Sequence, residues 1–289
     1  MTLFWLSLLL LLLIFSMDQL INKMYQYEKK PHLITPEEHN IGFEEILIPS
    51  NKNSQLYGWW ITASPEAPTL ILLHGWGRNL SRMMPYIQKL HPLGYNLLAF
   101  DARNHGSSSP IKHPTVGTFS EDVLTVVDFL STSNLISSDR IGILGLSIGG
   151  GAAINAAGWD NRIRSVITVG ALSHPETLMK HEFKKRHIPD FISSAILGYM
   201  RFRFGLDFDK IAPVNNITTA NAAFLLIHGD EDETVPFAHG QALVEAGNPD
   251  HARLWLVPGK GHSNCHKHPD FWEKVDAYLK ETLLVEEQK

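Results

Sequence analysis

The sequence predicts an α/β protein built on a mostly parallel, doubly wound sheet of about eight strands. Nearly continuous apolar runs alternate with helical stretches over most of the 289 residues, which is typical of parallel strands that are buried on both faces. Polar, glycine-containing segments follow several of these runs, at the strand ends where such sheets carry their ligand sites. The hydrophobic share of 44% is ample for one core.

The first element is an apolar run over residues 3–15, from which we predict an N-terminal transmembrane anchor over residues 1–22. As a helix, the first seventeen residues span about 25 Å, which is marginal for a bilayer core of roughly 30 Å. Lysines flank only the downstream side, at Lys23, Lys29 and Lys30, and this favours a single-pass anchor with a cytoplasmic domain. The alternatives are a cleaved signal peptide, although no basic start or small-residue cleavage site is visible, and a buried core helix.

The remaining elements form one domain over residues 40–284. Two strands joined by a polar turn open it as a hairpin, near 46–48 and 55–61. Further strands are expected at about 69–73, 95–100, 141–145, 165–170, 223–228 and 253–257. Helices are expected near 81–92, 118–132, 148–158, 237–247 and 270–284.

Ser147 stands in the string Gly145-Leu146-Ser147-Ile148-Gly149, between a strand and a helix. A sharp strand-to-helix turn of this kind is a nucleophile elbow, and its glycines permit strained backbone and close approach of neighbouring chain. The loop 74–77 follows an earlier strand, and its backbone N–H groups can complete an oxyanion hole with that of Ile148. An ordinary turn is the alternative for the string alone.

Candidates for the other catalytic groups follow in the order acid, then histidine. The acid belongs to the loop 228–236, where Asp230 and Glu233 compete with Asp232. His262 lies between glycine and serine in a loop before the last helix and is the natural general base. We expect His74 and His105 to be structural hydrogen-bonding residues.

Together these motifs resemble the α/β-hydrolase superfamily, in its branch of serine aminopeptidase-like and prolyl-oligopeptidase-like hydrolases and esterases. The resemblance covers residues 40–283 and rests on the loops 74–77, 101–108, 145–150, 228–236 and 259–262. It implies Ser147 as nucleophile, Asp232 as acid and His262 as base. It further implies the N–H groups of Trp76 and Ile148 as oxyanion donors. Asn104 departs from the glycine that is usual before the His-Gly pair, but asparagine tolerates positive φ. We expect Asp101 to brace the loops.

The interval 173–216 is too long for a simple crossover, and we interpret it as a helical cap inserted above the active site. Helices packed on the sheet edge are the alternative. As a cap it places four candidates at an acyl pocket: Phe191, Ile196, Met200 and Phe204. Its basic stretch at 180–187 would suit a membrane surface or an anionic substrate head.

These residues predict a membrane-anchored serine hydrolase that cleaves an ester-type carbonyl of a small-molecule or lipid-like acyl substrate through an acyl-enzyme. The alternatives are a peptidase or thioesterase on the same triad, or a catalytically silent binding protein of the same fold.

No metal or organic cofactor is expected. The formal charge is −5 and the basic residues are scattered, so the sequence does not predict a basic surface that would bind nucleic acid. The single cysteine, Cys265, excludes an intramolecular disulfide and argues against a thiolate metal site. It lies near His262, His266 and His268, in what we interpret as a solvated loop.

Overall fold

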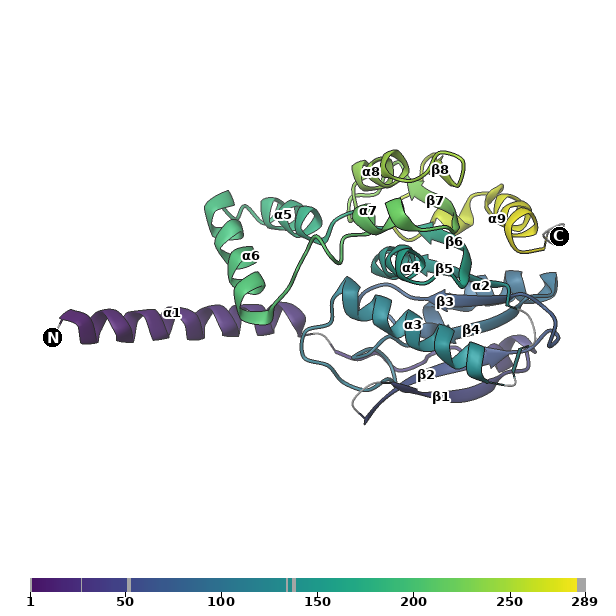
Figure 1. The fold of residues 1–289 in the computed structure, drawn as a ribbon, viewed down its shortest axis with the longest axis horizontal. Helices are drawn as coiled ribbons and strands as arrows, with labels where there is room; N and C mark the ends of the chain where they lie inside the picture. Colours follow the sequence, from purple (N-terminus) through teal and green to yellow (C-terminus); the bar gives the residue numbers. More distant parts are fainter. Residues whose placement is uncertain (1, 27, 51–52, 134, 137–138, 285–289) are drawn as a thin grey trace.

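The computed structural model describes residues 2–26, 28–50, 53–133, 135–136 and 139–284. Within these residues eight strands form one sheet, in the order β1-β2-β4-β3-β5-β6-β7-β8 (Figure 1). The strands are β1 Glu44–Ser50, β2 Ser54–Ile61, β3 Thr69–Leu73, β4 Asn96–Phe100, β5 Ile141–Leu146, β6 Ile163–Val169, β7 Ala223–Gly229 and β8 Ala252–Val257. β2 runs antiparallel to β1 and β4, and all other neighbours are parallel. The predicted fold class is confirmed.

The helices follow the predicted alternation, with differences at their ends. They are α1 Thr2–Tyr25, α2 Met84–Leu90, α3 Val116–Thr132, α4 Ile148–Trp159, α5 Pro175–Lys185, α6 Asp190–Phe204, α7 Pro213–Asn216, α8 Ala238–Ala246 and α9 Phe271–Leu279. Short 3₁₀ segments span Pro36–His39, Leu80–Met83, His91–Leu93, Ile217–Thr219 and Cys265–Lys267, and a π-helical turn spans Lys280–Leu284. The helix expected at 81–92 is divided because Pro85, which has no N–H, starts the α-helical part.

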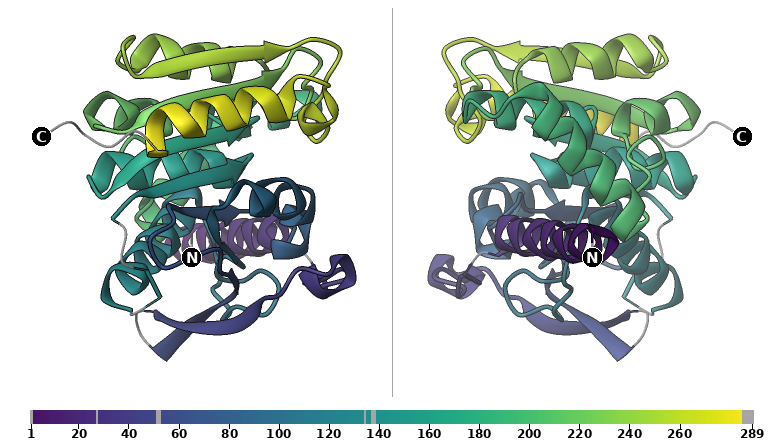
Figure 2. Two further views of the ribbon diagram at one scale, coloured as in Figure 1. Left: turned by 90° about the vertical axis from the view of Figure 1, so that its right-hand side faces the viewer. Right: turned by 90° about the vertical axis from the view of Figure 1, so that its left-hand side faces the viewer.

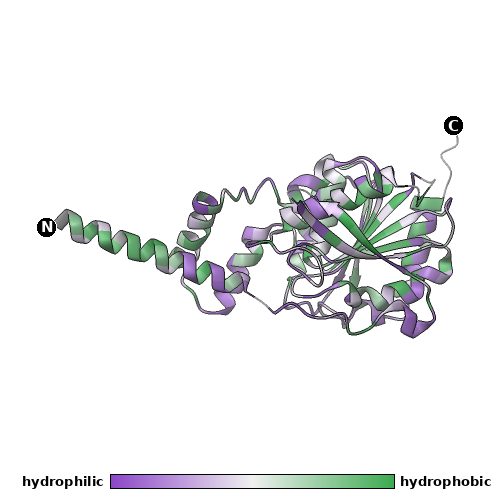
Figure 3. Cartoon of the chain, turned by 90° about the horizontal axis from the view of Figure 1, so that it is seen from below, coloured by the Kyte–Doolittle hydropathy of each residue, from purple (hydrophilic) through white to green (hydrophobic). Residues whose placement is uncertain are grey.

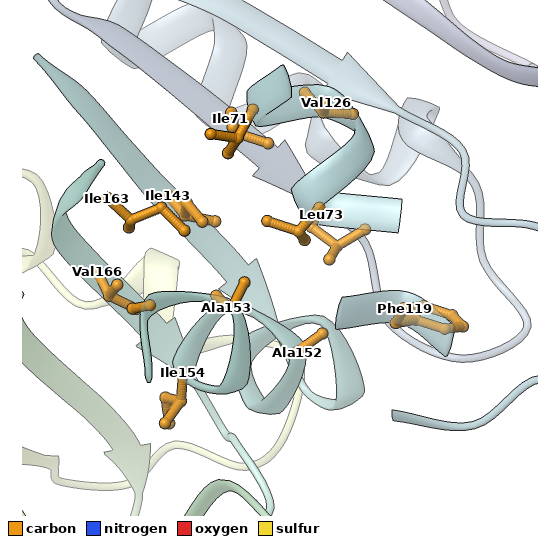
Figure 4. Packing of buried hydrophobic residues seen from close by; sticks show 14 of the residues in the cluster. Ile71, Leu73, Phe119, Val126, Ile143, Ala152, Ala153, Ile154, Ile163 and Val166 are labelled. Atoms are coloured by element: carbon orange, nitrogen blue, oxygen red, sulfur yellow. The ribbon is translucent and has the colours of Figure 1, made fainter. Parts of the chain in front are cut away.

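Two hydrophobic cores lie on opposite faces of the sheet. On β3, Ile71 and Leu73 pack into one core, whereas Leu70 and Leu72 pack into the other, as the two-residue period of a strand requires. α3 and α4 cover the first core, and Figure 4 shows their side chains meeting those of the central strands. α2 and α9 cover the second core (Figure 2). The apolar strands are therefore buried on both faces.

The position of a site follows from the strand order. From β3 the chain crosses to β4 on one side of β3 and then returns to β5 on its other side. Parallel pairing places Leu73 at the end of β3 beside Gly145 near the end of β5. The loops that follow these strands leave in opposite directions, and the crevice between them is where doubly wound sheets bind ligands.

The helix α1 projects away from the sheet, and Figure 3 shows its projecting part as hydrophobic. Its 24 residues correspond to a length of roughly 36 Å. The helix ends at Tyr25, three residues beyond the predicted end of the anchor at residue 22. The stretch Phe4–Tyr25 is long and apolar enough to cross a membrane, and only 6% of an apolar 18-residue window within it is buried in the protein.

The end of α1 packs against the segment 173–216. Ile21 is fully buried in a third cluster with Phe183, Ile196, Leu197, Met200 and Phe208, and the Tyr199 hydroxyl donates a hydrogen bond of 2.7 Å to Asp18. This cluster is separate from the two sheet cores. α5 and α6 pack on each other and, through this cluster, on the end of α1 (Figure 1). Their role as a cap above the site stays a prediction.

Candidate active site

Ser147 lies on a strained turn between β5 and α4. Its backbone has φ 56° and ψ −121°, outside the regions that residues with side chains favour. A Cβ on Gly145 would lie 2.3 Å from the carbonyl oxygen of Gly149, and a Cβ on Gly149 would lie 2.5 Å from the carbonyl oxygen of His74. The two glycines are therefore required for the turn, and the strain presents Ser147 at the start of α4.

Asp232 and His262 are brought together by the loops after β7 and β8. Oδ2 of Asp232 lies 2.7 Å from Nδ1 of His262, and the Asp232 side chain is fully buried. Its Oδ1 accepts backbone hydrogen bonds from Thr234 and Val235, at 3.0 and 2.8 Å. The carboxylate is thus held by fixed donors and can orient the imidazole so that Nε2 is left for chemistry.

The competing carboxylates point elsewhere. Asp230 is exposed, and its Oδ1 accepts a hydrogen bond of 3.3 Å from the backbone of Lys260. Glu233 is also exposed. Of the three candidates, Asp232 alone contacts His262 among the described interactions.

A further histidine supports the acid loop. His228 is buried, and its Nε2 donates to the carbonyl oxygen of Val235 at 2.8 Å, because a carbonyl can only accept. Burial lowers the pKa of His228, so its ring is neutral at physiological pH. The same atom lies 3.6 Å from Oδ2 of Asp232. Sequence reasoning missed this residue.

Ser147 and His262 line one cavity of about 340 Å³, together with Gly75, Trp76 and residues of the neighbouring loops. The Ser147 hydroxyl is not hydrogen-bonded to His262 among the described contacts; such bonds commonly tighten when substrate binds. A Cβ on Gly75 would lie 3.2 Å from Cβ of Ser147, so the loop 74–77 passes directly beside the serine. The next amide is that of Trp76, and the amide of Ile148 follows Ser147 in the chain.

His74 and His105 hold these loops by hydrogen bonds, as expected. Nδ1 of His74 donates to the carbonyl of Gly75 at 2.7 Å, and its Nε2 accepts from the backbone of Ala102 at 3.2 Å. Nε2 of His105 accepts from the amide of Gly77 at 3.1 Å. Burial lowers the pKa of His74, and it lowers the pKa of His105 to about 3. Both rings are therefore neutral and fully engaged.

A second, apolar cavity of about 200 Å³ shares Trp76 of the loop 74–77 with the first. Trp76 lines both cavities, and Ile148 lines the apolar one. Its other walls come from elements far apart in sequence: Tyr25 at the end of α1, Leu178 on α5, and Ile211 before α7. The contribution of α1 was not predictable, since no local pattern links residue 25 to residue 178.

The four predicted pocket residues line neither of these cavities. Ile196 and Met200 are buried beside Ile21, where they hold α1. Phe204 packs against His113, with ring centroids 4.4 Å apart, and Phe191 is 76% exposed. Their predicted contact with an acyl chain stays a prediction.

We interpreted the loop around Cys265 as solvated. This is wrong for Cys265, whose side chain is buried. Cys265 is 1% exposed and packs in the core covered by α9, and burial raises the pKa of its thiol to about 11. His266 packs against the ring of Tyr86. This segment is therefore structural, and it fixes the loop that carries His262.

Sheet order, elbow and loop positions together define an α/β hydrolase. The chain belongs to the prolyl oligopeptidase family, whose sequence model matches residues 111–285. Human alpha/beta hydrolase domain-containing protein 17B is 25% identical over 248 residues, which cover 83% of this chain and 76% of that protein. The Escherichia coli protein YfhR, which is uncharacterized, is 25% identical over 247 residues, covering 82% and 80%.

Among solved structures, the esterase Pf2001 of Pyrococcus furiosus is similar with a TM-score of 0.73 at 24% identity, covering 89% of this chain and all of that one. The ferulic acid complex of Est1E from Butyrivibrio proteoclasticus has a TM-score of 0.62 at 21% identity, covering 82% and 96%. These likenesses establish the fold, and the comparisons as a whole support a hydrolase.

Proposed function

We propose that the protein is a serine hydrolase that cleaves an ester through an acyl-enzyme intermediate. The observation that carries this proposal is the contact of 2.7 Å between Asp232 and His262, at the cavity that His262 shares with Ser147. Nε2 of His262 takes the proton of the Ser147 hydroxyl as its oxygen attacks the carbonyl carbon, and Asp232 stabilises the imidazolium that forms.

The N–H groups of Trp76 and Ile148 stabilise the oxyanion of the tetrahedral intermediate. Collapse of the intermediate breaks the ester bond, and the His262 proton passes to the leaving oxygen. A water molecule then attacks the acyl-enzyme and gives its proton to His262. When the second tetrahedral intermediate collapses, His262 returns this proton to the Ser147 oxygen, and the carboxylic acid is released.

The apolar cavity is the proposed site of the acyl group. It borders Ile148 on the side of the oxyanion donors, and its walls carry aromatic and aliphatic side chains. At about 200 Å³ it is below the roughly 300–1,000 Å³ of typical small-molecule sites. It therefore fits a short acyl group, or the part of a longer chain next to the carbonyl.

We further propose that α1 anchors the protein in a membrane, with the catalytic domain in the cytoplasm as the downstream lysines favour. A helix that is apolar on all sides and exposed belongs in lipid. Packing of Ile21 and Tyr25 against the cap and cavity supports retention of the helix over its removal as a signal peptide.

The outer face of α6 supports the same placement. Phe191, Ala195, Gly198 and Phe202 follow a helical spacing on one face, and the two phenylalanines are 76% and 88% exposed. Figure 1 shows α1 passing beside α6 and continuing beyond it. We propose that this apolar face contacts the bilayer that α1 crosses, which would assign Phe191 to lipid contact in place of the acyl pocket.

Active-site labelling tests the enzymatic proposal. A fluorophosphonate probe should label the full-length protein, and Ser147→Ala should abolish both labelling and hydrolysis of p-nitrophenyl butyrate. Ser263→Ala, which changes an exposed serine beside His262, is the matched control and should still be labelled. Labelling that survives Ser147→Ala would exclude Ser147 as the nucleophile, and absence of labelling in the unchanged protein would favour a silent binding protein.

A thioesterase is the second candidate, because the thiohydrolase aneE of Aspergillus aculeatus is 26% identical over 166 residues, covering 56% of this chain and 50% of that protein. A peptidase is the third, because of the family to which the chain belongs. Comparing kcat/KM for a butyryl oxygen ester, thioester and amide separates the three, and the proposal requires the oxygen ester to be preferred.

A further inference from the structure

The chemistry of the reaction decides which part of the substrate enters which cavity. The general acid must reach the leaving oxygen, and His262 lines the 340 Å³ cavity but not the apolar one. The leaving group therefore lies in the 340 Å³ cavity, which we call the leaving-group cavity. The acyl group lies on the other side of Trp76. This assignment rests on the proposed function.

Two arginines line the leaving-group cavity. Arg78 and Arg82 follow the loop 74–77 directly in sequence, and neither is paired with a carboxylate among the described ion pairs. Nη2 of Arg82 donates a hydrogen bond of 2.9 Å to the carbonyl oxygen of Ser263, which fixes its guanidinium beside the loop of His262. Arg78 is exposed to the cavity mouth.

Among the described residues that line the leaving-group cavity, none is acidic. Asp232 is fully buried and hydrogen-bonded to His262. Two guanidinium groups without a carboxylate partner among the described ion pairs create a positive potential in a concave site, which focuses the field on an anionic ligand.

A second groove continues this positive strip outward. It has a volume of about 210 Å³ and is lined by Arg78 and Arg82 together with Lys30. The backbone of Lys30 is fixed in place, because Nδ2 of Asn79 donates a hydrogen bond of 2.8 Å to its carbonyl oxygen. The lining of this groove, as far as the structure describes it, also contains no acidic residue. A leaving group can therefore extend past the two arginines and still meet a positive charge.

From this arrangement we propose that the natural substrate is an acyl ester whose leaving alcohol carries an anionic group, held by Arg78 and Arg82. A planar guanidinium donates paired hydrogen bonds to a phosphate or a carboxylate, so both anions are chemically suitable. The anion places the leaving oxygen at His262 while the acyl group lies in the apolar cavity.

Three hexanoyl esters test this proposal with purified full-length protein in neutral detergent. Their alcohols are glycerol, glyceric acid and glycerol 3-phosphate, which differ in charge but carry the same acyl chain. We expect kcat/KM for one or both anionic esters to exceed that for the glycerol ester by about tenfold or more, the effect of one charge-assisted hydrogen bond. The two anionic arms distinguish carboxylate from phosphate.

Variants of the two arginines test whether these residues cause the preference for anionic esters. The double change Arg78→Gln and Arg82→Gln should reduce the ratio of kcat/KM for the anionic esters to kcat/KM for the glycerol ester to near one. Arg78→Lys should retain part of this preference. Arg164→Gln is the matched control, because it removes the same charge from the far, amino-terminal end of β6 and should leave the ratio unchanged. Equal kcat/KM for all three esters, or an anionic preference that survives the double change, would overturn the proposal.

Binding separates this proposal from the enzymatic one. The Ser147→Ala protein should bind intact hexanoyl glycerol 3-phosphate or the glycerate ester more tightly than the glycerol ester by calorimetry, and the added arginine changes should remove the difference. Ser147-dependent hydrolysis without charge preference in binding or turnover contradicts only the anionic leaving group. Charge-selective binding without any turnover in the unchanged protein contradicts only the proposed hydrolysis.

Discussion

Nε2 of His32 lies 2.8 Å from Oδ2 of Asp101, and this contact joins the segment after α1 to the loop after β4. The same segment is held at Lys29, whose Nζ donates to the carbonyl oxygen of Ser108 at 2.8 Å. Asp101 in turn accepts backbone hydrogen bonds from Leu80 and Ser107, both at 2.8 Å. The segment 29–32 is therefore part of the loop structure beside the active site, although sequence reasoning placed the domain boundary at residue 40.

Two truncated chains test this boundary. A chain that begins at Glu28 keeps the contacts of Lys29 and His32, whereas a chain that begins at Glu37 loses them. We expect both to be soluble and to hydrolyse short esters, because the catalytic motifs lie beyond residue 70. The Glu37 chain should melt about 5–10 °C lower, the shift expected for a loss of about 2–3 kcal/mol in a domain of this size. Equal melting temperatures by circular dichroism would show that the segment contributes nothing.

Fractionation tests the anchor. The full-length protein should sediment with membranes and resist carbonate extraction, and its N-terminus should be intact by mass spectrometry, because residues 3–15 of α1 form an apolar run without a charged residue. The Glu28 chain is the control and should remain in the supernatant. Recovery of the uncleaved full-length chain in the soluble fraction contradicts the anchor, whereas a mature N-terminus beyond residue 17 identifies a signal peptide.

Acid stability should depend on Asp101. Burial opposes ionisation of its carboxyl group, but the hydrogen bonds from His32 and from the backbone of Ser107 outweigh it, so the pKa of Asp101 is lowered on folding. A lowered pKa means that the ionised form stabilises the fold above the unfolded value of about 3.9 and that this stabilisation is lost as pH falls below it.

Asp101→Asn should therefore lower the free energy of unfolding by about 2–3 kcal/mol at pH 7. This difference between the unchanged protein and the variant should become smaller below about pH 4. Urea unfolding at pH 7, 5 and 3.5 measures the difference. Asp139→Asn, at a side chain that is 83% exposed, is the control and should show no such change. A difference in the free energy of unfolding that grows toward low pH would mean that folding does not lower the pKa of Asp101.

The catalytic residues should act as a unit. Ser147→Ala, His262→Ala and the double change should each reduce kcat by roughly 10⁴-fold or more, and their effects should not multiply. Asp232→Asn should cost at most as much as the serine change, whereas Asp230→Asn should change kcat by about twofold or less, as an exposed substitution does. Loss of turnover in Asp230→Asn with activity kept in Asp232→Asn would identify Asp230 as the acid.

Gly170 provides a test of how closely the catalytic pair is packed. It has φ +65°, and a Cβ there would lie 3.0 Å from Nδ1 of His262 and 3.1 Å from Oδ2 of Asp232. Gly170→Ala should cost about 1–2 kcal/mol of stability from the backbone alone and should also reduce kcat by about tenfold or more.

Gly259 is the matched control for this change. It has nearly the same φ, +63°, but open space around its Cβ position. Gly259→Ala should therefore lose similar stability and keep its turnover. Equal kcat in the two variants would show that the pair tolerates displacement.

The sequence predicted those parts of the site that depend on local chain geometry. The glycines around Ser147, the loop 74–77 and the position of His262 are local patterns, and strand periodicity gave the sheet. The packing of α1 on the segment 173–216 depends on contacts between residues far apart in the sequence, such as Ile21 and Met200. A local hydrophobic period cannot predict such contacts. Arg78 and Arg82 lie close to the loop 74–77 in the sequence. Only the structure shows that both side chains line the same cavity.

Trp76 lines both cavities, so the two cavities adjoin during the second half of the proposed reaction. In the proposed reaction, the acyl chain still occupies the apolar cavity once the alcohol departs, and the cavity lined by His262 becomes the entrance for the next nucleophile. Water then competes there with any small polar alcohol of suitable size. At high glycerol concentration the acyl-enzyme should therefore partition between hydrolysis and transfer, and the protein should synthesise glycerol esters from activated acyl donors.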